Sequence, residues 1–160
     1  MQNALRINST DITVANEKLK IWRRGLEAEK DGDLAEDAKQ LLDELASLAN
    51  DPVAIADRFY SDIDFGTAGL RGLRGAGSAA INAFTVRHAT KALAEYICRI
   101  GKSEQGEATV AISYDTRNNS RRFADIAAKT LNANGIDVLI FDEASPVPEL
   151  AFATARHNCD

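Results

Sequence analysis

Two apolar runs separated by one amphipathic pattern constrain the fold of this 160-residue chain more than any other feature. The runs are TVAISYD at 109–115 and DVLIFDE at 137–143, and both have the aliphatic composition of buried strands. Residues 120–134 have helical periodicity, and Gly135 follows as the expected C′ residue. Strand, helix and strand in this order predict a βαβ unit with parallel strands and a right-handed crossover. The predicted inward face of the helix consists of Phe123, Ile126, Ala127, Thr130 and Leu131.

Two further helices are predicted on either side of this unit. The first covers 85–100, and Cys98 within it is expected to be buried. The second begins in SPVPELAFATARH, with Pro148 near its first position. Because ligands of parallel sheets gather at the carboxyl ends of the strands, SYDTRNNS (113–120) and EASPVP (143–148) are predicted to form one functional rim. The predicted inward face of the first helix consists of Val86, Ala89, Leu93, Ile97 and Ile100.

The first sixty residues have a different texture, dense in Ala, Leu, Glu and Lys. Leucines recur at three- and four-residue steps, which predicts two amphipathic helices separated by KDGD around Gly32. Asp51 as N-cap and Pro52 at the first helical position predict a third short helix running toward Tyr60. We therefore expect a helical arm over 1–60, followed by an α/β region.

Charge and cysteine usage exclude some classes of partner. A net charge of −5 argues against a nucleic-acid binder, which usually needs a basic surface. No signal-peptide core or membrane span is recognised, and Cys98 and Cys159 lack metal or redox spacing, so we expect a cytoplasmic protein with no membrane partner. No HExxH, Cys/His set, P-loop or DxDxD cluster is present, so no metal site is predicted in this chain.

The glycine-punctuated stretch FGTAGLRG (65–72), continued by Gly75 and Gly77, is the strongest local indication of chemistry. Glycines allow close backbone approach to a ligand, Thr67 offers a hydroxyl, and Arg71 offers a planar fork for phosphate oxygens. We favour a phosphate-proximal role over a plain connection. A weaker alternative reads GAGSAA (75–80) as a dinucleotide-binding loop, although no buried strand precedes it.

A second candidate anion site follows the strand at 109–115. Backbone N–H groups at a helix start, together with Arg117, suit an anion, while capping by Asn118, Asn119 or Ser120 is a compatible structural explanation. Asp115 is predicted to orient Arg117 and not to act as a base. Arg121 and Arg122 either extend a positive rim or are simply solvated.

Taken together, FGTAGLRGLRGAGSAAIN, TVAISYDTRNNS and SPVPELAFA resemble the N-terminal part of the α-D-phosphohexomutase superfamily. The branch most similar is the phosphoglucomutase/phosphomannomutase group that includes phosphopentomutase-type enzymes. The resemblance implies an α/β fold class: a helical N-terminal arm (1–60), then an incomplete three-layer α/β/α domain I with a mixed, mainly parallel sheet (61–160). It places Thr67 and Arg71 in the motif lining the phosphoserine site, and Asp115 and Arg117 in the strand-end motif beside it.

The resemblance also implies a reaction. Family members are isomerases that move a phosphoryl group between a phosphoserine and a phosphosugar, with Mg²⁺ held by an aspartate cluster in the second domain and a sugar bisphosphate as activator. The family serine lies in T-A-S-H-N-P after a strand, whereas the similar TARHN here has Arg156, which is not a nucleophile.

Because 148–157 is predicted to be helical, the serine loop is expected beyond Asp160, in a chain truncated before its nucleophile, inactive alone and completed by the remaining domains. These residues do not choose between glucose, mannose and pentose. An alternative is a stand-alone, non-catalytic module that binds a phosphosugar or a partner domain.

Overall fold

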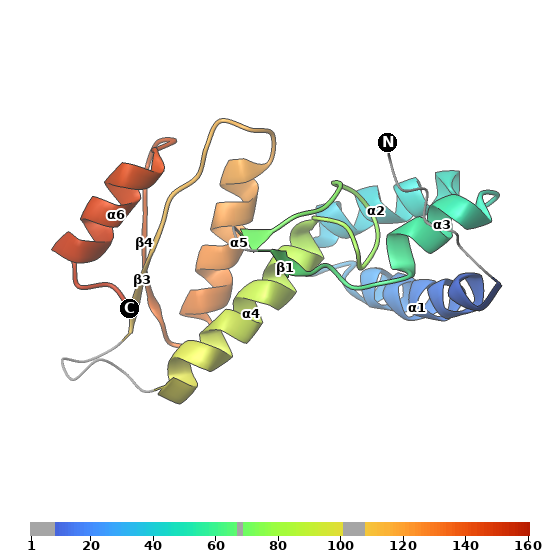
Figure 1. Ribbon diagram of the computed structural model, residues 1–160, viewed down its shortest axis with the longest axis horizontal. Helices are drawn as coiled ribbons and strands as arrows, with labels where there is room; N and C mark the ends of the chain where they lie inside the picture. Colours follow the sequence, from blue (N-terminus) through green and yellow to red (C-terminus); the bar gives the residue numbers. More distant parts are fainter. Residues whose placement is uncertain (1–8, 67–68, 101–107) are drawn as a thin grey trace. The chain divides into compact units, whose positions relative to one another are not determined.

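The computed structural model describes residues 9–66, 69–100 and 108–160 (Figure 1). They have an α/β fold and divide into two compact units, Met1–Thr85 and Val86–Asp160, which are described separately. The described part of the chain contains no helix long and apolar enough to cross a membrane.

Three helices begin the first unit, as the leucine spacing predicts. They are α1 (Ser9–Ala28), α2 (Ala35–Ser47) and α3 (Pro52–Phe59). The Asp51 carboxylate accepts hydrogen bonds from two backbone N–H groups of the first turn of α3, which confirms the predicted N-cap. α1 packs against both α2 and α3.

An apolar core holds these helices together. Leu26, Leu45 and Phe59 are almost completely buried in it. Trp22 lies edge-on to Phe59 and Phe84, with ring centroids 5.7 and 6.1 Å apart. Burial of aromatic rings in this geometry contributes more than their area alone, so this cluster anchors the unit.

The glycine-rich stretch forms a small hairpin and a tight loop. β1 (Phe65–Gly66) pairs antiparallel with β2 (Gly69–Leu70), and a single bridge then joins Arg74 to Ile81. Asn82 caps α4 (Ala83–Ile100): its Oδ1 accepts from the Thr85 N–H, and its own N–H donates to Thr85 Oγ1.

The predicted parallel strand pair is present in the second unit. β3 (Thr109–Ile112) pairs in parallel with β4 (Asp137–Ile140), and α5 (Ser120–Asn132) connects them. Figure 1 shows α5 on one side of this strand pair and α6 (Val147–Arg156) on the other, so helices cover both faces. This layering is that of an α/β/α domain.

The ends of α5 and α6 follow local sequence cues. After α5, the Gly135 N–H donates to the Asn132 C=O and the Ile136 N–H donates to the Leu131 C=O, which together form a Schellman motif. α6 continues to Arg156, so the TARHN segment is largely helical, as predicted.

The predicted inward face of α4 is partly wrong. Ile97 is buried, but Leu93 and Ile100 are 47% and 62% exposed, and Ala94 is fully buried instead. The buried side chains of α4 pack with Leu131 after the crossover, so the buried face is rotated toward position 94 and away from the larger aliphatic residues. A helix surface with 3.6 residues per turn can bury Ala94 and Ile97 without burying Leu93.

Two other burial predictions are corrected. Cys98 is exposed, because it lies beside the buried face of α4, and its Sγ is 3.8 Å from the Asn134 carbonyl oxygen. On α5, Ile126 and Leu131 are buried as predicted, but Ala124 is buried as well.

Candidate functional site

The loops that follow β3 and β4 lie together, as the carboxyl-end rule predicts. The Ser145 N–H donates to the Tyr114 C=O at 3.0 Å, and the Tyr114 hydroxyl donates to the Asp142 C=O at 2.6 Å. The predicted rim of residues 113–120 and 143–148 is therefore real, and it is closed by hydrogen bonds between the two loops.

Arg121 on α5 fastens this rim. Its Nη1 donates to the Tyr114 hydroxyl at 2.8 Å and to the Asp142 C=O at 3.2 Å, while its Nε donates to Asp125 at 2.9 Å. The guanidinium also lies over the Tyr114 ring, 5.0 Å from its centroid. The Tyr114 hydrogen bond and then Asp125 raise the pKa of Arg121. Arg121 is thus engaged in structure, a role that the sequence left open between a positive rim and plain solvation.

Asp115 and Arg117 form an orienting pair at the end of β3. Asp115 accepts hydrogen bonds from the Arg117 backbone N–H at 3.1 Å and from Arg117 Nε at 2.7 Å. The Arg117 backbone N–H first, then the Ser120 hydroxyl, then the Arg117 side chain lower the pKa of Asp115. The Arg117 side chain is 87% exposed. A carboxylate that stays ionised therefore aims an exposed guanidinium, as predicted.

The start of α5 differs from the ordinary capping that the sequence offers. Asn119 is the N-cap residue, has φ = 67°, and makes no side-chain capping hydrogen bond. The Ser120 hydroxyl accepts from the Asp115 N–H at 3.2 Å. Ser120 therefore supports the loop that carries the orienting pair.

The hairpin places one of its two candidate residues within the described chain. Thr67 lies outside the described residues. Arg71 follows β2 directly and is exposed, and a Cβ added at Gly66 would lie 3.9 Å from Arg71 Cδ. The aliphatic stem of Arg71 thus passes close to the backbone of β1, which only a residue as small as glycine leaves open.

Gly75 and Gly77 have a structural role that sequence reasoning missed. Both have positive φ, 138° and 128°, and a Cβ on Gly77 would collide with the backbone oxygen of Arg58. A Cβ on Gly75 would collide with the Arg58 guanidinium and the Glu44 carboxylate. These two glycines serve close packing against the helices, where the sequence pattern suggested only approach to a ligand.

The dinucleotide-loop alternative lacks its structural context. A single bridge at Arg74, and no buried strand, precedes 75–80, and α4 begins only at Ala83. Within the ranges that the structure describes, no three His, Cys, Asp or Glu side chains come together in a group that could hold a metal ion.

Comparison with known proteins places this geometry in a family. The family model described as phosphoglucomutase/phosphomannomutase, alpha/beta/alpha domain I, matches residues 62–160. A phosphoglucomutase of Staphylococcus saprophyticus is 41% identical over 99 residues, which cover 62% of this chain and 17% of that protein. A phosphoglucomutase of Staphylococcus aureus strain RF122 is 37% identical over 102 residues, which cover 64% of this chain and 18% of that protein.

The match thus spans less than a fifth of the length of these curated relatives. No solved structure matches the chain significantly. The matched residues include the hairpin, the parallel strands and the rim that they support, and they make up well over half of the chain. This protein therefore belongs to the phosphoglucomutase/phosphomannomutase family, through its α/β/α domain I.

Proposed function

We propose that this chain supplies domain I of a phosphosugar mutase. Such an isomerase interconverts sugar 1-phosphates and 6-phosphates, or the pentose equivalents, by intramolecular phosphotransfer through a phosphoserine. The observation that carries the proposal is the exposed guanidinium of Arg117, held by Asp115 at the carboxyl end of β3 within the family-matched region. The phosphoglucomutase names of the relatives support the same reaction class.

We further propose that residues 1–60 are a helical arm and that 61–160 are the phosphosugar-mutase domain. The three helices α1, α2 and α3 end at Phe59, and the family match begins at 62. A cytoplasmic location and the absence of a nucleic-acid partner are part of this proposal, supported by the net charge of −5.

Stabilising a phosphoryl group in transit is mostly a matter of positioning and charge neutralisation. Arg117 suits this task because its orientation is set in advance by Asp115, and the first N–H groups of α5 lie beside it in sequence. We assign Arg71 the same kind of contact and Thr67 a hydroxyl contact, the latter on sequence grounds alone. Because its pKa is lowered by the Arg117 N–H, Asp115 remains an acceptor and is not a proton donor at neutral pH.

Mg²⁺ and a sugar bisphosphate activator belong to the proposed reaction of a whole enzyme. Mg²⁺ is bound in proteins by carboxylate oxygens and phosphates. The described residues offer no set of three such side chains, so we assign this part of the chain no role in holding the ion.

The proposal is tested by phosphate binding to the 160-residue chain. Isothermal titration with inorganic phosphate and with glucose 1-phosphate should give measurable affinity, weakened about tenfold by Arg117→Ala and by Arg71→Ala, as expected for loss of a charge-assisted contact. Arg23→Ala, an exposed arginine of α1, is the matched control and should bind like the wild type. Equal affinity in all four proteins would refute the assignment.

A mutase assay tests the reaction of the chain by itself. The sequence contains no T-A-S-H-N-P motif, so the chain alone should show no turnover of glucose 1-phosphate with a bisphosphate activator. Turnover at the rate of a complete mutase would overturn this expectation.

A further inference from the structure

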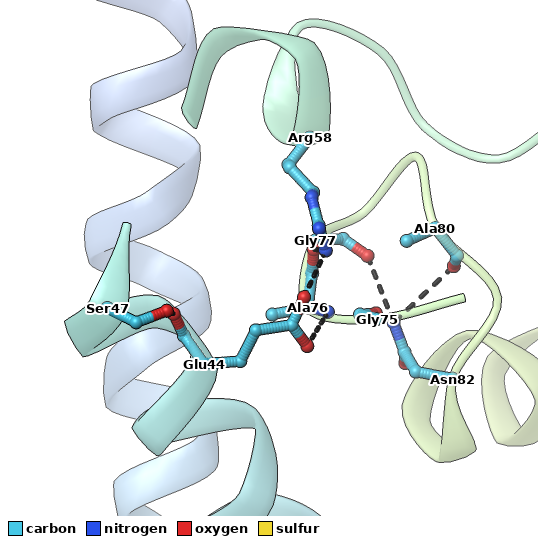
Figure 2. Close-up of polar contacts among 8 residues, drawn as sticks. All are labelled: Glu44, Ser47, Arg58, Gly75, Ala76, Gly77, Ala80 and Asn82. Atoms are coloured by element: carbon cyan, nitrogen blue, oxygen red, sulfur yellow. Dashed lines mark hydrogen bonds and ion pairs between the residues drawn. The ribbon is translucent and has the colours of Figure 1, made fainter. Parts of the chain in front are cut away.

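An ion pair on the helical arm holds the backbone of the glycine loop. Figure 2 shows Glu44 of α2 and Arg58 of α3 converging on Ala76. Arg58 Nη1 donates to the Ala76 C=O at 3.1 Å, and the Ala76 N–H donates to Glu44 Oε2 at 2.9 Å. Arg58 Nη1 also pairs with Glu44 Oε1. Both backbone polar groups of Ala76, a fully buried residue, are thus satisfied by two charged side chains from another part of the sequence.

This pair differs from an ordinary surface salt bridge. The Arg58 and Glu44 side chains are only 21% and 31% exposed, and each makes a backbone hydrogen bond besides the ion pair. Loss of either partner would leave buried backbone groups and a partly buried charge unsatisfied, which is the costly way to break such a pair.

The loop is also held from its other side. Asn82 Nδ2 donates to the Gly75 C=O at 2.9 Å and to the Gly77 C=O at 3.1 Å (Figure 2). The Ala79 N–H donates to the Arg58 C=O at 3.1 Å. The loop therefore sits between the arm and the first residues of α4, with its backbone direction determined from both sides.

Hydrogen bonds carry this placement back toward Arg71. The Gly75 N–H donates to the Ile81 C=O at 3.2 Å, and the Ile81 N–H donates to the Leu73 C=O at 2.8 Å. A Cβ at Gly72 would lie 3.0 Å from the Ala79 C=O, so this stretch has little room to shift. The residue immediately before it is Arg71.

We propose that Glu44 and Arg58 are positioning residues for phosphate recognition: by holding Gly75–Gly77 they determine where the segment carrying Arg71 presents its guanidinium. This inference rests on the phosphate contact assigned to Arg71 above. Neither Glu44 nor Arg58 touches phosphate itself in this scheme. The helical arm thereby becomes a determinant of anion affinity as well as a packing element.

Two measurements on the whole 160-residue chain test the proposal, with Glu44→Ala as the main variant. Backbone amide hydrogen exchange at Ala76 should accelerate about tenfold or more, because its acceptor is removed. Affinity for inorganic phosphate should fall about five- to tenfold. Glu17→Ala, which removes an exposed ion pair with Lys20, is the control and should change neither.

A double-variant comparison separates positioning from general loss of structure. If Glu44 acts through Arg71, then Glu44→Ala should weaken phosphate binding in the wild type but not in the Arg71→Ala background. An equal effect in both backgrounds, or no effect in the wild type while Arg71→Ala weakens binding, would overturn the positioning role. If Arg71→Ala has no effect, the assigned phosphate contact fails and the positioning role fails with it, while the Ala76 exchange rate still reports whether the ion pair holds the loop.

Two milder variants keep the test decisive should Glu44→Ala fail to fold. Glu44→Gln retains the shape and an acceptor oxygen but loses the charge, and Arg58→Lys retains the charge but loses the fork geometry. Both should weaken phosphate binding in the same direction as Glu44→Ala and by a smaller factor. Wild-type affinity in both would count against the proposal.

Discussion

Replacing Gly77 with alanine should destabilise the unit Met1–Thr85 by about 2–4 kcal/mol. Part of this cost is conformational: φ at Gly77 is 128°, and a non-glycine residue in such a region costs about 1–3 kcal/mol. The rest is steric, because the new Cβ would collide with the Arg58 backbone oxygen and lie 2.8 Å from Arg58 Cβ. Relief of that collision would lengthen the bond from the Ala79 N–H to the Arg58 C=O, worth about 0.5–1.5 kcal/mol.

Urea unfolding followed by tryptophan fluorescence measures this cost directly. Trp22 is the single tryptophan of the chain, and it packs edge-on against Phe59 and Phe84 in the same unit as Gly77. With a urea dependence of about 2 kcal/mol per molar, the expected loss lowers the midpoint by about 1–2 M.

Two other glycines separate the conformational from the steric contribution. Gly69 has φ = 98° and nothing within 4 Å of an added Cβ, so Gly69→Ala should cost only about 1–2 kcal/mol. Gly25 lies within α1 with open space around it, and Gly25→Ala should stabilise the unit by about 0.5–1 kcal/mol. A Gly77→Ala midpoint at or above that of Gly69→Ala would refute the steric reasoning.

Three further predictions follow from local geometry. Asp51→Ala removes the acceptor for two backbone N–H groups of α3 and should cost about 1 kcal/mol in the same urea titration; an unchanged midpoint would contradict the cap. The folded-state pKa of Asp115 is lowered, chiefly by the Arg117 N–H, so its contribution to stability is present above the ordinary pKa of about 3.9 and is lost as pH falls through the lower folded value. The stability difference between wild type and Asp115→Asn should therefore shrink on acidification below about pH 4, and a difference that grows there would contradict the sign. Arg121→Ala should accelerate amide exchange at Ser145, because the rim loses its fastening side chain, whereas wild-type exchange would show that Arg121 is dispensable there.

Elements whose causes lie within a few residues were predictable. The Asp51–Pro52 helix start and the end of α5 at Gly135 depend on neighbouring backbone groups, so both appear in the structure as the sequence predicts. The orienting pair was predictable for the same reason, since Asp115 and Arg117 are two positions apart. The fastening of the rim was not, because Arg121 reaches the Asp142 carbonyl, 21 positions along the chain.

By itself, then, the sequence determined the type and order of the elements, because hydrophobic periodicity and caps act within a single turn or strand. Only the tertiary structure decided which neighbours those elements meet. It buried Ala94 of α4 and left Leu93 exposed, and it seated Gly75 and Gly77 on an ion pair whose Glu44 lies 32 positions from its partner Ala76. Contacts at that separation depend on how helices and loops pack against one another, and no local pattern of residue types encodes that packing.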